Sequence, residues 1–148
     1  MKIGEFRPEF AEFIPKELAE GVLYVSMNYA TVRHLCACGC GTQVVTPLSP
    51  PKWSLTFDGD TVSLCPSIGN WQFPCRSHYW IQRNKVKWSR QWSNEEIAEA
   101  MRRDAEDLER YQRGEWQPTP KPTQPVASPR RGLLRWLTDV IRVPLRKW

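Results

Sequence analysis

Cysteine is the residue type whose spacing in this sequence most clearly indicates chemistry. Three of the five cysteines, Cys36, Cys38 and Cys40, occupy alternate positions in the stretch HLCACGCG. A second group follows in NWQFPCRSHYWI, where Cys75 and His78 have the spacing C-x-x-H. Such crowding is compatible with a metal site, with disulfides or with nucleophilic chemistry, and the rest of the sequence bears on that choice.

Disulfide bonding is the weakest of these interpretations. The N-terminal stretch MKIGEFRPEFAEF mixes charged and aromatic residues and lacks the apolar segment of a secretory signal. No apolar run approaches the length of a membrane span. We therefore expect a cytoplasmic protein, in which clustered cysteines more often bind metal or act in catalysis than form disulfides. The odd number of cysteines agrees, because full pairing would leave one thiol over.

A structural zinc site accounts best for two short clusters about 35 residues apart. Gly39 and Gly41 permit the tight turn that brings alternate cysteines to one ion, which a straight strand would not do. Two further potential ligands are set aside. We expect Cys65 to be buried as a small apolar residue of a strand, and His34 could as easily be a hydrogen-bonded strand residue as a ligand.

Five candidates then remain for the four positions of a tetrahedral zinc site. They are Cys36, Cys38, Cys40, Cys75 and His78. If all four cysteines bind Zn²⁺, His78 keeps a free imidazole near the metal. If His78 binds, one of the first three cysteines is spare. We favour the four cysteines, because they already fill a tetrahedral site with thiolates.

The elements that must position these residues are mostly short strands. Residues 1–92 contain short apolar runs between turn formers, including GVLYVSM, TQVVTPL, KWSLTF and TVSLCP. Asp58-Gly59 predicts one hairpin, and Asn84, between HYWIQ and KVKW, predicts a second. We therefore expect a small, mainly antiparallel, zinc-stabilised β domain.

The chain changes character after residue 92. Ser93 and Glu96 form a capping box, and Ile97 begins a modest apolar stripe, so we expect a helix over residues 93–114. We favour a helix that packs on the β domain over one that binds a partner. Residues 115–129 hold five prolines and predict an extended linker. Residues 130–148 predict a basic amphipathic helix suited to an anionic membrane surface, a partner's groove or a return onto its own domain.

The charge distribution argues against nucleic acid as a partner. The net charge of +5 equals the local excess within residues 128–148, so the chain before them is formally neutral. The basicity therefore belongs to the tail and says little about the partners of the main domain.

Four stretches of the sequence together resemble one protein family. HLCACGCG, PLSPPKWSL, PSIGNW and CRSHYWI, spanning about residues 20–90, are similar to a small bacterial family encoded beside ubiquitin-like proteins and their activating and conjugating enzymes. The resemblance implies a zinc-containing protein of a bacterial ubiquitin-like modification pathway, acting as the peptidase that matures or removes the modifier. Its partners would be the ubiquitin-like protein and its conjugates or conjugating enzymes.

The residues can support a serine peptidase better than a metallopeptidase. No H-E-x-x-H motif is present, and four protein ligands leave no position for a catalytic water. In PSIGNW, Ser67 follows a proline, and Gly69 and Asn70 are expected in a turn whose N–H groups face an oxyanion. His78, fixed by the zinc loop, would be the general base. The plainer interpretation of Ser67 is a hydroxyl that bonds its own turn.

Other residues of the sequence are candidates for the same roles. Ser49 and Ser77 are alternative nucleophiles, although Ser77 is adjacent to His78 and would reach it poorly. Asp58 and Asp60 are possible orienting acids, but a hairpin turn favours aspartate at both positions. The leading hypothesis is a zinc-stabilised serine peptidase with Ser67 and His78 as catalytic residues. The alternative is a non-catalytic zinc-binding adaptor that uses its many tryptophans as anchors.

Overall fold

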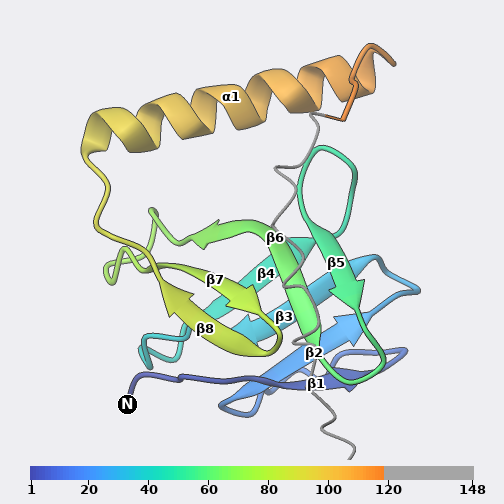
Figure 1. The fold of residues 1–148 in the computed structure, drawn as a ribbon, viewed down its shortest axis with the longest axis vertical. Coiled ribbons are helices and arrows are strands. Elements are labelled where there is room, and N and C mark those ends of the chain that lie inside the picture. Colours follow the sequence, from blue (N-terminus) through green and yellow to red (C-terminus); the bar gives the residue numbers. More distant parts are fainter. Residues whose placement is uncertain (119–148) are drawn as a thin grey trace, which may run out of the picture.

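The computed structural model describes residues 1–118, which form two four-stranded sheets followed by one helix (Figure 1). The first sheet has the order β1-β2-β3-β4, and its strands are β1 (Arg7–Phe10), β2 (Val22–Ser26), β3 (Thr31–Leu35) and β4 (Gln43–Pro47). The second has the order β5-β6-β7-β8, and its strands are β5 (Ser54–Phe57), β6 (Val62–Gly69), β7 (His78–Gln82) and β8 (Lys85–Trp88). The expected mainly β fold with one following helix is confirmed.

Both hairpins predicted from turn residues are present. β5 and β6 pair in antiparallel fashion, and the Asp58 carboxylate closes their turn by accepting the backbone N–H of Thr61 at 2.6 Å. β7 and β8 also pair in antiparallel fashion, and Arg83 and Asn84 between them have φ angles of 48° and 66°. Positive φ at both central residues is the geometry of a tight hairpin turn. β1, which pairs in parallel with β2, was not predicted.

The hydrophobic core lies between the two sheets. Side chains alternate between buried and more accessible positions along β3 and β4, whereas all five residues of β2 are buried. The buried set comprises Phe6, Leu23, Val25, Val32, Cys36, Ala37, Val44, Val62, Leu64, Ile68, Tyr79 and Ile81. The first cysteine of the cluster, Cys36, is thus part of the core, so one end of the cluster is anchored there.

One buried polar pair joins the two sheets through this core. His34 of β3 and Tyr79 of β7 are fully buried, and His34 Nε2 lies 2.9 Å from the Tyr79 hydroxyl. Of the two roles left open for His34, the structure shows the hydrogen-bonded strand residue. This pair matters for the site described below, because Tyr79 directly follows His78 in β7.

The helix α1 (Asn94–Gln112) begins at the predicted capping box and lies across one end of the sheets (Figure 1). Ser93 Oγ accepts the Glu96 N–H, and the Glu96 side chain accepts the Ser93 N–H. Ile97 is the one buried residue of α1, whereas Met101, four residues farther along the helix, is exposed. No helix within residues 1–118 has the length and apolar character to cross a membrane. The expected tail helix, and all but the start of the expected linker, lie outside the described residues.

Candidate active site and metal centre

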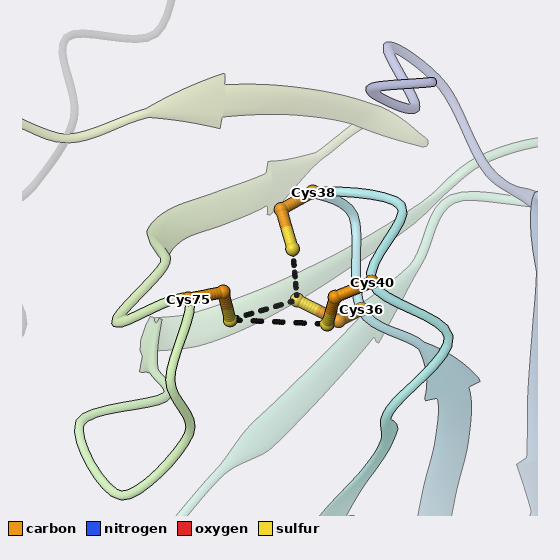
Figure 2. Close-up of side chains that lie close together, drawn as sticks. All are labelled: Cys36, Cys38, Cys40 and Cys75. Atoms are coloured by element: carbon orange, nitrogen blue, oxygen red, sulfur yellow. Dashed lines mark hydrogen bonds between the residues drawn. The ribbon is translucent and has the colours of Figure 1, made fainter.

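Four cysteine side chains converge from two loops (Figure 2). Cys36 follows β3 directly, Cys38 and Cys40 come from the turn that leads to β4, and Cys75 comes from the loop between β6 and β7. The turn depends on glycine at residues 39 and 41, where φ is 83° and 74°. The expectation that glycines fold this stretch back on itself is confirmed.

The sulfur positions fit a tetrahedral metal site. All four Sγ atoms lie within 4.8 Å of one another. Cys75 Sγ lies 3.9 Å from Cys36 Sγ and 3.9 Å from Cys40 Sγ, and the Cys36–Cys38 distance is 3.4 Å. Zinc held by four thiolates at about 2.3 Å requires sulfurs roughly 3.8 Å apart. The cluster is therefore compatible with a structural metal ion, and four protein ligands would complete its coordination.

A buried polar pair ties the β6–β7 loop to this cluster. Ser77 Oγ lies 3.1 Å from Cys36 Sγ, and Asn70 Nδ2 donates to Ser77 Oγ at 2.9 Å. The Asn70 N–H also donates to the Ser77 carbonyl at 2.9 Å, which closes the loop at its base. Burial raises the pKa of the Cys36 thiol, and the Ser77 hydroxyl opposes that rise. Cys75 lies within this loop, so the cluster and the base of the loop form one unit.

A β-bulge interrupts β6 beside this loop. Leu64 pairs with Ile81 but Ile68 pairs with Tyr79, so residues 65–67 have no regular partners in β7. Bulges re-aim side chains and are frequent beside active sites. This bulge contains the serine of PSIGNW.

Ser67 and His78 are in direct contact across these strands. Ser67 Oγ lies 2.8 Å from His78 Nε2, which is within the range expected of a nucleophile and its base. Ser67 is partly accessible, whereas His78 is only 4% exposed. Desolvation, with a smaller effect of the Arg90 charge, lowers the pKa of His78 from its ordinary value of 6.5. The imidazole is therefore neutral at pH 7 and able to accept a proton.

Three tryptophans enclose the imidazole of His78. Its ring centroid lies 4.7 Å from that of Trp71, 4.5 Å from that of Trp92 and 5.4 Å from that of Trp80. Trp80 follows His78 by two residues and so shares its face of the sheet. The sequence did not predict this arrangement, and only the alternative adaptor hypothesis gave the tryptophans a role, as anchors. The alternation of side chains in H-Y-W could have placed Trp80 beside His78, but no local pattern in the sequence indicates that Trp71 or Trp92 contacts His78.

Ser67 and His78 line a cleft of about 680 Å³. Its aromatic lining includes Trp53 and Trp92, and α1 contributes charged residues that include Asp104. A concave site that combines aromatic rings with polar groups is the usual form of a ligand-binding site. The helix therefore forms one wall of the cleft even though its own burial is slight.

Three details of the sequence interpretation are wrong. Cys65, expected to be buried, is exposed on the bulge of β6, although it lies outside the cysteine cluster as expected. Gly69 was expected in a turn but is the last residue of β6, paired with His78. The Asn70 N–H was expected to face an oxyanion and instead closes the loop by bonding Ser77. β6 continues to Gly69 because Pro66 lies in the bulge, where no regular pairing with β7 is needed.

Two of the other candidates, Asp58 and Ser77, have structural roles. The Asp58 carboxylate is used by its own hairpin turn, where its oxygens also accept from the Asp60 N–H and the Thr61 hydroxyl. The Ser77 hydroxyl faces the cysteine cluster and not His78. The geometry therefore brings Ser67 and His78 together, and places Ser77 behind the cysteines.

Comparison with known proteins extends this description. Residues 10–89 match the family model described as bacterial ubiquitination-like system serine protease (BubE). The chain belongs to this family. The match covers more than half of the chain and spans the cysteine cluster, Ser67 and His78. The family expected from the four sequence motifs is thus confirmed. Searches of curated proteins and of solved structures gave no match.

Membership of the BubE family places the chain in a bacterial ubiquitination-like system and among proteins described as serine proteases. The matched residues end at the close of the second sheet, so α1 and the rest of the chain lie beyond the matched region.

Proposed function

We propose that this BubE-family chain is a zinc-stabilised serine peptidase that processes or removes a bacterial ubiquitin-like modifier. The observation that carries the proposal is the 2.8 Å contact between Ser67 Oγ and His78 Nε2 at the edge of an aromatic cleft. The family description supports the reaction class.

In this proposal Ser67 is the nucleophile and His78 is the general base. As Ser67 Oγ attacks the carbonyl carbon of the scissile bond, its proton passes to His78 Nε2. His78 then returns the proton to the departing amine, which leaves an acyl group on Ser67. A water molecule, deprotonated by the same imidazole, hydrolyses this ester and restores both side chains. Desolvation keeps the imidazole neutral before the reaction, which is the protonation state that a base requires.

The four cysteines would hold one Zn²⁺ as a structural ion. The chemistry that zinc supplies there is cross-linking, because four thiolates complete its coordination. Cys75 stands three residues before His78, and Ser77 of the same loop contacts Cys36. The ion would therefore fix the loop that leads into β7 and so the position of the base. Reduced thiols agree with a cytoplasmic location.

The substrate is proposed to enter the cleft as an extended segment at the C-terminus of the modifier. We assign residues 1–92 to the catalytic β domain and residues 93–114 to the helix that walls the cleft. Residues 115–129 serve as a tether, and residues 130–148 serve localisation or partner contact and no catalytic role.

The experiment is cleavage of the modifier extended past its C-terminus, followed by intact mass. Ser67→Ala and His78→Ala should each lose turnover while keeping zinc and melting temperature. The double variant should be barely worse than either single one, because the two residues act as a unit. Ser49→Ala is the matched control and should keep full turnover.

Turnover that persists in Ser67→Ala would overturn the catalytic assignment. Zinc loss in His78→Ala would instead identify His78 as a ligand. A wild-type protein that binds the modifier without cleaving any extended form would support the adaptor interpretation.

A further inference from the structure

One nitrogen of the proposed base has no hydrogen-bond partner. His78 Nδ1 is buried and contacts no acceptor within residues 1–118. For Nε2 to accept the Ser67 proton, the neutral ring must carry its own proton on Nδ1. In the usual arrangement a carboxylate accepts that proton and fixes the tautomer. No carboxylate of the described residues does so here.

Indole rings occupy the surroundings of this imidazole. Trp92 meets His78 at an interplanar angle of 83° and Trp71 meets it at 66°, both in edge-to-face arrangements. Trp71 and Trp92 are themselves stacked, with an interplanar angle of 23°. The two indoles are therefore held by each other as well as by His78. Aromatic faces accept N–H groups weakly and attract cations more strongly, with tryptophan the best of the aromatic side chains.

The charge that develops in the proposed reaction needs a counterpart. When the Ser67 proton moves to Nε2, the ring becomes an imidazolium that is only 4% exposed. The positive charge of Arg90 disfavours a positive ring at His78, and Arg90 is itself paired with Glu96. An ionised ring without any favourable partner would be costly in this setting.

We propose that Trp71 and Trp92 replace the orienting acid of a serine peptidase: their edge-to-face packing positions the imidazole of His78, and the π face of Trp92 stabilises its cationic form. This inference rests on the proposed function, since it assigns partners to the proposed base. The two tryptophans are positioning residues. Neither takes or gives a proton.

The test compares Trp92→Phe and Trp92→Leu with the wild type and with Trp88→Leu. Trp88 is the control because it packs on Tyr79 of the same sheet, away from His78. The first measurement is the pKa of His78 by NMR in the free protein. Loss of the π face should lower that pKa in Trp92→Leu, with Trp92→Phe intermediate and Trp88→Leu unchanged. The second is kcat, which should fall roughly 2- to 30-fold in Trp92→Leu and less in Trp92→Phe.

An unchanged or higher His78 pKa in a Trp92→Leu variant that keeps its zinc and fold would overturn the inference. If that variant unfolds, Trp92→Phe alone decides, and an unchanged pKa there would also overturn it. In the wild type, an Nδ1 proton resonance of His78 shifted far downfield, as in a histidine–carboxylate pair, would contradict the inference. The pKa is measured without substrate, so this inference can fail while Ser67→Ala still abolishes turnover, or hold while the peptidase assignment fails.

Discussion

Gly69→Ala should damage the site without damaging the fold. A methyl group at Gly69 would lie 2.4 Å from the Cε2 and Nε1 atoms of Trp71. Carbon atoms in good contact are about 3.5 Å apart, so the indole must retreat by about 1 Å. Trp71 contacts both His78 and Trp92. The displacement would therefore pass directly to the proposed base.

The expected loss of turnover is large relative to the change in stability. A misplacement of about 1 Å in a catalytic arrangement costs on the order of 10²-fold in rate. Gly69 does not have a positive φ, so alanine is allowed by the backbone there. The cysteine cluster is untouched, so zinc content should be unchanged and melting temperature should shift by only a few degrees.

The assay is steady-state cleavage of the extended modifier, with zinc content and thermal melting measured on the same preparation. Gly4→Ala is the matched control, because a methyl group there meets no atom within 4 Å. Gly69→Ala with full kcat would refute the argument that Trp71 positions His78. Loss of zinc in this variant would show instead that the substitution disrupts the loop as a whole.

Three further predictions concern protonation, metal and the core. Burial lowers the pKa of His78, so its neutral form persists at pH 7. The value of kcat/KM should therefore stay constant around pH 7 and fall about tenfold per pH unit below the pKa of His78. An acid limb centred at or above pH 6.5 would contradict this. Metal analysis should find about one zinc per chain in the wild type and in Cys65→Ser but none in Cys38→Ser, and zinc retained at full stoichiometry by Cys38→Ser would exclude that thiol as a ligand. Tyr79→Phe should lower the free energy of unfolding in urea by about 1–3 kcal/mol, because it removes the partner of the fully buried His34 Nε2; an unchanged value would show that this bond contributes nothing.

The cysteine cluster was predictable because its signal is local. Alternate cysteines with glycines between them must turn, and the second group lies at a separation typical of a metal site. The hairpins at Asp58-Gly59 and Asn84 were predictable for the same reason, since turn residues have intrinsic preferences. Cys65 was misjudged because the bulge that exposes it depends on the pairing of β6 with β7, which no local pattern specifies.

The surroundings of His78 depend on long-range packing, which sequence patterns do not predict. Trp71 comes from the loop after β6 and Trp92 from the segment before α1, and they meet only because both cover the outer face of β7. β1 was missed because its parallel pairing with β2 gives its four residues a weak alternation. The contact of Ser67 with His78 was a hypothesis from sequence, and their distance gives it a geometric basis.

Labelling by a fluorophosphonate probe tests the central claim most directly. The probe reacts with a serine only when a neighbouring base activates it. We predict one adduct per wild-type chain, mapped by peptide mass to Ser67, with none in Ser67→Ala or His78→Ala and full labelling in Ser49→Ala. A wild-type protein that contains zinc, is folded and takes up no probe, or that is labelled at a serine other than Ser67, would contradict the account.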